Sequence, residues 1–472
     1  MKALLKLLPV SALIATCFAQ GTSKPALPKD LPPAGPLKPV VAPSVEAHKL
    51  KNGMTVWLVE RTALPKVIFT LEVRGGDSLD PASAPGLARV MAKSIVEGTA
   101  SKSSRQIAEA AQGAGGDLGT SVNSDSVEVT LDSLSEHAAD AVALVADVAE
   151  HATFPEKEVA EVKSNMENEL RSNEAEPGFL ARRAWFRVVY GDHPYSIVAP
   201  AMKTLEGATP ESLRTLYGQA FRPDQALLVA VGTFEPAEML KQIDSVFGGW
   251  RASGARPMNV KEPKGDVVHK IYYLERPGSV QTTLVIGTTG PNLSAPDYPY
   301  LRLANTVYGG SFGSRLIQNI REDKGYTYSP FSRVSTRRWS GEILTNEDVR
   351  NAVTGASLKE TFYELKRIST APPTAVELHQ AKQFLLGNTA VRLQSRDSVA
   401  ALLGKYWIED VAPQHLTEEM DAIQKATDTQ VAQAGAGYLT PERMNVIAVG
   451  EKSVILDQLK PFGMQVIAAP AP

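Results

Sequence analysis

The sequence contains a single cysteine, Cys17, among 472 residues. An intramolecular disulfide and a zinc or iron–sulfur site built on several cysteines are therefore excluded. An excess of charge is also lacking, because 49 Lys and Arg residues balance 52 Asp and Glu residues to a formal net charge of −3. This balance gives no reason to expect a nucleic acid or an anionic membrane surface as a partner.

Histidine pairs are missing as well. The chain has seven histidines, and no two of them lie within five residues of each other. Two histidines one turn apart on a helix form the usual grip on a catalytic zinc ion, so no such motif is present. A zinc site assembled from distant residues stays open, and the sequence predicts no metal in this chain.

Long apolar runs are absent except near the amino terminus. Residues 7–19 are apolar and follow Lys2 and Lys6. The run is shorter than the roughly 20 residues that span a bilayer, so we predict no transmembrane helix and a cleaved signal peptide over residues 1–19. The alternative is a lipoprotein signal that leaves the chain anchored through Cys17. Both interpretations predict an exported protein, periplasmic or secreted.

The remaining organisation follows from proline and glycine. Residues 20–44 are proline-rich and predict an extended linker or an arm that lies on a partner subunit. Residues 252–266 lack hydrophobic periodicity and predict an interdomain linker. The expected domains are therefore residues 45–251 and 267–465, with a tail at 466–472.

The two expected domains end in the same pattern. Residues 208–232 align without a gap on residues 426–450, with six identical positions at a constant offset of 218. Each block predicts a helix, a turn containing proline, and an apolar strand, which indicates a duplicated domain. The predicted fold class is α+β, with two homologous domains that each hold a mixed sheet with helices on one side.

The segment 86–99, GLARVMAKSIVEGT, resembles the zinc-binding helix of peptidase family M16 (insulinase, pitrilysin and mitochondrial processing peptidase). Active members read G-L-A-H-F-L-E-H, and here Arg89, Ala92 and Lys93 replace the first histidine, the glutamate and the second histidine. Two cations would repel Zn²⁺, and alanine cannot act as a base. The resemblance places the third ligand of the family at Glu169.

A single carboxylate does not make a zinc site. We therefore predict that Glu169 forms an ion pair with Arg89 or Lys93, so that complementary charge takes the place of the metal. The alternative is that all three side chains are solvated.

A second motif of the family is intact. Residues 308–316, YGGSFGSRL, and 320–329, IREDKGYTYS, are similar to its C-terminal domain pattern. The pattern predicts a helix that ends at Gly325, followed by a strand opened by Tyr328. In the family, the residues matching Arg321 and Tyr328 contact the substrate backbone and the carbonyl oxygen under attack. Taken without the motif, they would be a helix-end arginine and a core tyrosine.

A zinc helix that lacks its ligands, in the same chain as an intact arginine–tyrosine pair, resembles one half of a two-subunit peptidase. The predicted function is a non-catalytic, substrate-binding subunit of a heterodimeric M16 zinc metallopeptidase, inactive alone. An H-x-x-E-H-bearing paralogue would hold the zinc, and peptides or unfolded polypeptides would be the substrates. The alternatives are an inactive structural or peptide-binding protein, and a homodimer that captures peptides without cleaving them.

Overall fold

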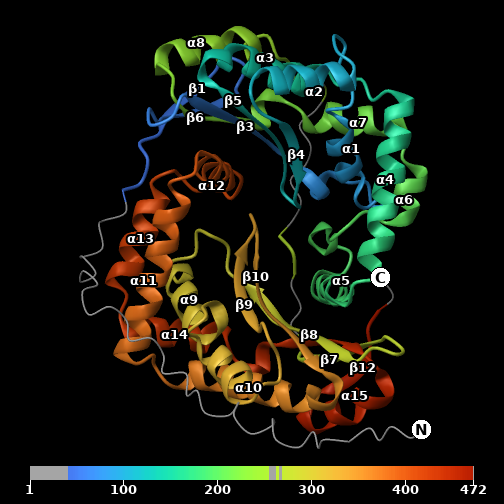
Figure 1. The fold of residues 1–472 in the computed structure, drawn as a ribbon, viewed down its shortest axis with the longest axis vertical. Coiled ribbons are helices and arrows are strands. Elements are labelled where there is room, and N and C mark those ends of the chain that lie inside the picture. The colour runs from blue at the N-terminus through green and yellow to red at the C-terminus, as the bar shows by residue number, and fades with distance from the viewer. Residues whose placement is uncertain (1–40, 253, 255–261, 265–267, 471–472) are drawn as a thin grey trace, which may run out of the picture. The chain divides into compact units, whose positions relative to one another are not determined.

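The computed structural model describes residues 41–252, 254, 262–264 and 268–470. The expected signal peptide with Cys17, most of the proline-rich segment and most of the interdomain linker lie outside these residues. The described chain forms two halves of like design, each built on one six-stranded sheet (Figure 1).

The N-terminal sheet alternates apolar residues between its two faces. In its central strand, Phe69 and Leu71 face the helices of the same half, whereas Ile68 joins the core of the other half. The pairing of β2 with β6 is parallel and the other pairings are antiparallel. The strand order is β1 (Glu46–Lys49), β2 (Thr55–Glu60), β6 (Ala226–Gly232), β3 (Lys66–Arg74), β5 (Ser126–Leu134), β4 (Leu118–Val122).

The C-terminal sheet repeats this arrangement with one change at its edge. Its first strand, β12 (Gln465–Ala468), comes from the end of the chain and pairs in parallel with its neighbour, whereas β1 is antiparallel. The sheet therefore extends to Ala468, past the expected boundary at residue 465. The order continues with β7 (Lys270–Glu275), β11 (Asn445–Gly450), β8 (Gln281–Gly290), β10 (Gly341–Arg350), β9 (Phe331–Thr336).

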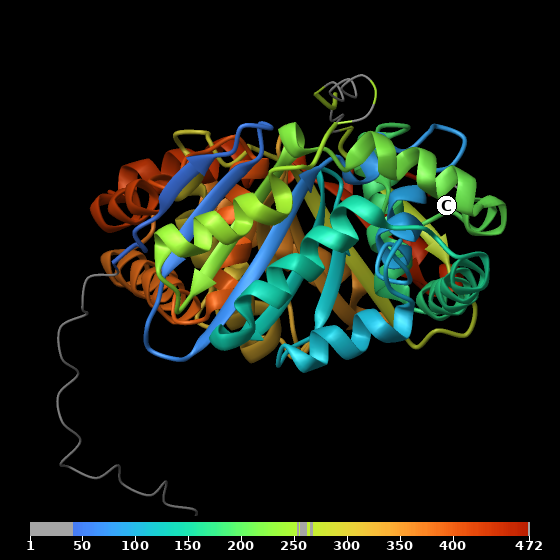
Figure 2. The same ribbon diagram turned by 90° about the horizontal axis from the view of Figure 1, so that it is seen from above.

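Apart from α5 and α12, the helices of each half lie on the outer side of its own sheet, and Figure 2 shows those of the first half lying over its strands. The first half holds α1 (Leu87–Ser94), α2 (Ser104–Gly113), α3 (Ala138–His151), α4 (Glu156–Glu174), α5 (Pro177–Tyr190), α6 (Met202–Gly207), α7 (Pro210–Ala220) and α8 (Pro236–Phe247). The second holds α9 (Tyr298–Asn305), α10 (Thr354–Thr370), α11 (Ala375–Arg392), α12 (Arg396–Ile408), α13 (His415–Lys425), α14 (Asp428–Tyr438) and α15 (Lys452–Leu459).

The predicted duplication is confirmed at the level of single residues. Helix α7 followed by β6 matches α14 followed by β11, and both helix bounds lie 218 positions apart. Thr209 and Thr427 each cap their helix with a reciprocal capping box. The predicted α+β class with two mixed sheets is therefore correct.

The second face of each sheet is covered by a helix of the other half. Helix α12 packs on β3 and β6, and α5 packs on β8 and β11. Trp185 and Phe186 of α5 share a buried cluster with Val285 and Ile447 of the C-terminal sheet. The two halves thus complete each other's cores, which a description of two independent domains does not predict. No helix among the described residues combines the length and apolarity needed to cross a bilayer.

Candidate functional site

Helix α1 begins at a tightly packed turn. Gly86 has a φ of 88°, and a side chain on it would place its Cβ 2.3 Å from the Cα of Pro200. Asp80 caps the helix by accepting the N–H groups of Gly86 at 2.6 Å and Ala88 at 2.7 Å. Burial, assisted by the neighbouring Asp77, raises the pKa of Asp80 to about 7. The turn and the cap together fix where α1 points.

The structure brings the four positions of the degenerate zinc motif together. Arg89, Ala92 and Lys93 from α1 and Glu169 from α4 line one cavity of about 160 Å³. The placement of Glu169 on the facing helix is therefore the one that the resemblance implied.

The predicted ion pair of Glu169 with Arg89 is wrong. The guanidinium of Arg89 instead donates to Asp77, with Nε 2.9 Å and Nη2 2.6 Å from the two carboxylate oxygens. Glu169 and Lys93 are exposed, and in the described part of the chain no ion pair joins Glu169 to either cation. The physical reason is burial. The Asp77 side chain is 0% exposed and needs a charged partner, whereas an exposed carboxylate gains little from one.

These residues do not fit zinc. Zinc in proteins takes thiolate, imidazole or carboxylate ligands, and arginine, alanine and lysine offer none of them. Elsewhere in the described ranges, no group of three or more His, Cys, Asp or Glu residues lies close enough to hold a metal ion. Burial raises the pKa of Asp77 while Arg89 lowers it, so Arg89 of the degenerate motif belongs to an ion pair whose carboxylate is fully buried.

The predicted arginine–tyrosine pair forms a stacked unit on the surface. The guanidinium carbon of Arg321 lies 4.8 Å from the ring centroid of Tyr328 and 4.9 Å from that of Phe312. Tyr328 is 79% exposed and Phe312 is 65% exposed, which is unusual for aromatic rings of this size. Exposed aromatic rings around a cation suit a surface that another molecule covers.

The backbone around this pair differs in part from the prediction. Arg321 lies in a π-helical segment, Ile317–Asp323, a form of helix that is frequent at functional sites. The helix ends as predicted at Gly325, which has a φ of 62° and donates its N–H to the carbonyl of Arg321 at 3.1 Å. Tyr328 does not open the strand, because β9 begins at Phe331.

Arg321 and Tyr328 line an open cavity of about 630 Å³, together with Gln281, Asp348 and Arg350. None of its lining residues lines the cavity of the degenerate zinc helix. Within the described chain, the arginine–tyrosine pair and the zinc-motif positions therefore belong to two separate cavities.

A neighbouring arginine anchors the arginine–tyrosine segment. Arg315 is buried and grips Glu377 with two hydrogen bonds of 2.7 and 2.9 Å. The guanidinium holds the pKa of Glu377 at about 2, well below its usual range. Glu377 also caps α11, so this pair ties the motif to the helix behind it.

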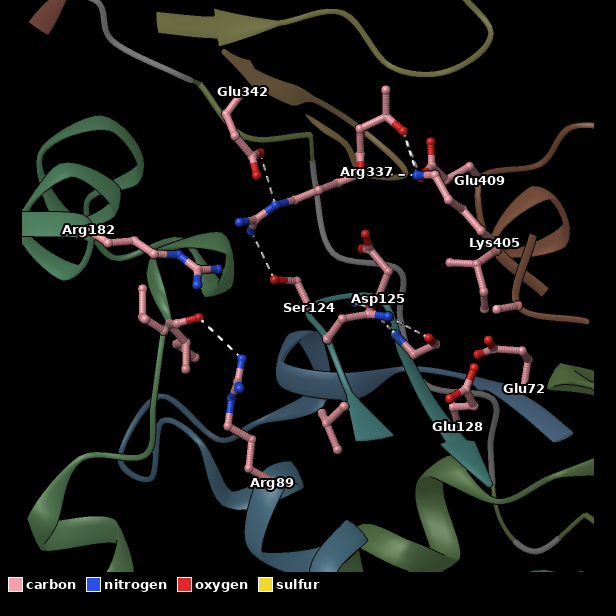
Figure 3. A pocket seen from close by; sticks show the side chains of 18 residues that line it. Glu72, Arg89, Ser124, Asp125, Glu128, Arg182, Arg337, Glu342, Lys405 and Glu409 are labelled. Atoms are coloured by element: carbon pink, nitrogen blue, oxygen red, sulfur yellow. Dashed lines mark hydrogen bonds and ion pairs between the residues drawn. The ribbon is translucent and has the colours of Figure 1, made fainter. Parts of the chain in front are cut away.

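A third cavity of about 430 Å³ lies where the halves meet, and sequence reasoning missed it. Its lining comes from the β4–β5 turn, from α5, from the β9–β10 turn and from α12 (Figure 3). Arg337 from the β9–β10 turn donates to the hydroxyl of Ser124 and to the carbonyl of Tyr195, both at 3.0 Å. Tyr195 in turn donates to Asp125 at 2.8 Å. Residues about 140 to 210 positions apart thus meet here, which no local pattern shows.

One residue of this third cavity did leave a signal. Glu72 is the single charged residue inside the apolar strand VIFTLEV, and a carboxylate at such a position is expected to be buried. Asp77, the partner of Arg89, left none, because only the packed fold brings it to α1.

Two family models match the chain. One, described as Insulinase (Peptidase family M16), matches residues 56–196, and the other, described as Peptidase M16 inactive domain, matches residues 207–385.

Curated relatives and solved structures agree with these matches. The chain is 26% identical over 364 residues to "Uncharacterized zinc protease YmxG" of Bacillus subtilis, covering 76% of this chain and 87% of that one. It is 23% identical to "Non-peptidase homolog YmxG" of Helicobacter pylori, covering 72% and 78%. A crystal structure of a peptidase M16 inactive domain from Pseudomonas fluorescens superposes with a TM-score of 0.80 at 26% identity, covering 86% of this chain and 98% of that one.

Proposed function

The chain belongs to peptidase family M16, and on this premise we propose that it is the non-catalytic, substrate-binding subunit of a heterodimeric zinc metallopeptidase. Its partner would be a paralogue that carries the H-x-x-E-H motif and the zinc ion. This chain would contribute Arg321 and Tyr328 to the partner's active site. One observation carries the proposal: the chain combines an ion pair on its degenerate zinc helix with an intact arginine–tyrosine pair. In that pair Tyr328 is exposed, and Arg321 is half-buried and forms an ion pair with the neighbouring Glu322 at 3.2 Å.

The chemistry of the pair suits a peptide. A guanidinium presents several donors in a fixed plane, and it can bind the carbonyl groups of an extended backbone. The hydroxyl of Tyr328 can donate a hydrogen bond to the carbonyl oxygen on which negative charge develops. Stacking against Phe312 and Tyr328 limits the motion of Arg321, so less conformational entropy is lost on binding.

The pair is also placed where a partner could use it. It lines an open cavity that is separate from the chain's own degenerate helix, so a role in hydrolysis requires a second protein. We further propose that the protein is exported, to the periplasm or outside the cell, and that its substrates are short or unfolded peptides.

The test is cleavage of a quenched fluorogenic peptide by this chain, by an H-x-x-E-H-bearing paralogue from the same genome, and by their mixture. We expect cleavage in the mixture and much less from either protein alone. Arg321→Ala and Tyr328→Phe should each lower kcat/KM of the mixture by about tenfold or more, as loss of an oxyanion donor does.

Two exposed residues away from this cavity supply matched controls. Tyr363→Phe on α10 removes a hydroxyl from a tyrosine that is also exposed, and Arg367→Ala removes an exposed arginine from the same helix. Neither should change cleavage. Full activity of the paralogue alone, unchanged by this chain, would contradict the proposal.

The second candidate is an inactive structural or peptide-binding protein with no part in proteolysis. The name of the Helicobacter pylori relative, which calls it a non-peptidase homolog, favours this candidate. It predicts that the mixture cleaves no faster than the paralogue alone.

A further inference from the structure

The cavity of about 430 Å³ between the halves plays no part in the proposed function. It shares no lining residue with the cavity of Arg321 and Tyr328. Figure 3 shows Arg89, Arg182 and Arg337 in one part of the cavity, which also holds Glu342; we call this part the cationic side. Glu72 and Glu128 lie in another part, the acidic side, near Lys405 and Glu409.

The cationic side has an unused guanidinium. Arg89 is engaged with Asp77, and Arg337 forms an ion pair with Glu342 at 3.2 Å. Arg182, on α5, has no carboxylate within ion-pair distance among the described residues, and its guanidinium carbon lies 5.6 Å from the ring of Phe186.

The electrostatics at Arg182 favour an incoming anion. Partial burial lowers the pKa of Arg182, and the nearby cations Arg337 and Arg89 lower it further, although the carboxylate of Glu342 opposes this shift. The charge of Arg182 is therefore held at a cost that Glu342 offsets only in part. Arg182 remains exposed, so a ligand in solution can reach it. A carboxylate placed between these guanidinium groups would relieve their repulsion and accept charge-assisted hydrogen bonds.

The acidic side has an unsatisfied carboxyl group. Glu72 and Glu128 lie directly opposite each other on β3 and β5, where like charges repel. Glu72 is only 5% exposed, and its Oε2 atom has no hydrogen-bond partner within the described structure. Burial and the neighbouring Glu128 raise the pKa of Glu72 well above its usual value. A buried carboxyl oxygen of this kind is costly unless a donor reaches it.

Helix α12 closes the cavity beside this group. A Cβ added to Gly404 would lie 2.7 Å from Oε1 of Glu72, so the glycine lets α12 approach the carboxyl group closely. Lys405 of α12 does not neutralise the acids, because its ammonium group is bound to Glu409 and Thr336.

We propose that this cavity binds a short peptide by its two free ends. The terminal carboxylate would bind to Arg182 between Arg89 and Arg337, and the terminal ammonium would donate to Glu72 and Glu128. An ammonium group carries three donors and no acceptor, which suits two carboxyl groups. The volume lies within the range of about 300–1,000 Å³ that is usual for small-ligand sites. The site acts in this chain alone and does not depend on a partner.

The experiment is isothermal titration calorimetry of the full chain with three probes: trialanine, N-acetyl-trialanine and trialanine amide. Acetylation removes the ammonium and amidation removes the carboxylate, while the rest of the peptide is retained. We expect trialanine to bind, and each blocked peptide to bind about tenfold more weakly or not at all. This comparison uses unaltered protein and so does not depend on any variant folding.

Variants then locate the site. Arg182→Ala should lower the affinity for trialanine by about tenfold. Glu72→Gln should also lower the affinity for trialanine, and the affinity for trialanine amide should stay low in this variant. Arg183→Ala is the matched control, because Arg183 is the next residue on α5 and is bound to Glu174 at 2.7 Å outside the cavity. It should leave binding unchanged.

Several results would overturn the proposal: no heat with trialanine, equal binding of all three probes, or equal loss in the Arg182→Ala and Arg183→Ala variants. A simple anion site would also overturn the proposal. It would be indicated if inorganic phosphate displaced trialanine, if this displacement required Arg182, and if Glu72→Gln had no effect. A failure of cleavage in the two-protein mixture bears on the proposed function and leaves this binding result intact.

Discussion

Replacing Arg89 by methionine tests whether an ion pair has taken the place of the metal. The substitution keeps much of the apolar stem and removes the guanidinium, which leaves the fully buried carboxylate of Asp77 without its two hydrogen bonds. Breaking a buried pair from one side costs about 3–5 kcal/mol. Because the Arg89 side chain is 24% exposed, we place the expected loss at the lower end, about 3 kcal/mol.

The loss should depend on pH. Burial raises the pKa of Asp77 and Arg89 opposes that rise, so the pKa is higher still in the variant. An acid whose folded pKa is raised stabilises the fold in its protonated form, and that stability is lost as pH rises through the folded pKa. The difference in the free energy of unfolding between wild type and Arg89→Met should therefore be largest near pH 8 and smaller near pH 5.

The assay is urea unfolding, followed by far-ultraviolet circular dichroism and by the fluorescence of the five tryptophans. Lys93→Met is the matched control, because Lys93 is exposed, lies one turn along the same helix and should shift stability by no more than about 0.5 kcal/mol. The double variant Arg89→Met with Asp77→Leu should recover most of the loss. A variant as stable as wild type, or a loss that does not change with pH, would refute the reasoning.

Three further predictions concern buried polar groups. Burial raises the pKa of Glu347 to about 7, so the carboxylate destabilises the fold once pH rises above that value. Glu347→Gln should therefore raise the free energy of urea unfolding by about 3 kcal/mol at pH 8 and by much less at pH 5. An equal gain at both pH values would contradict this. Arg315→Lys keeps the positive charge but loses the bidentate hydrogen bonding to the Glu377 carboxylate. It should lower the free energy of urea unfolding by about 1–2 kcal/mol, and an unchanged value would contradict the anchoring role. Tyr195→Phe removes a buried hydroxyl that donates to Asp125 and accepts from the backbone N–H of Trp339, in the other half, at 3.2 Å. The substitution should cost about 2 kcal/mol and lower Tm, and an unchanged Tm would contradict a role of this hydroxyl in joining the halves.

Much of the fold was predictable because its signals are local. The helix, proline turn and apolar strand repeat at a constant offset of 218, and both capping threonines lie at matching positions. The helix that ends before Gly325 also follows from a short motif, whereas the cavity shared by α1 and α4 was implied by the resemblance to the family.

The remaining features depend on packing between distant segments. Nothing in the sequence of α5 says that Trp185 and Phe186 will pack on the opposite sheet, because their periodicity is that of any amphipathic helix. The choice of Asp77 over Glu169 as the partner of Arg89 depends on which carboxylate is buried, which is known only once α1 is packed. The last strand, β12, pairs with the edge of β7. This pairing depends on the assembled sheet, so the final residues alone do not predict it.

The central claim is that Arg321 and Tyr328 complete an active site in a second protein. It is tested most directly by holding the H-x-x-E-H-bearing paralogue at a fixed concentration and titrating in this chain while peptide cleavage is measured. We predict that activity rises with added chain to a plateau at equal concentrations. The double variant Arg321→Ala/Tyr328→Phe, which keeps the rest of the surface, should compete with the wild-type chain for the paralogue without activating it. Activity that is already maximal without this chain, or that the double variant restores in full, would contradict the account.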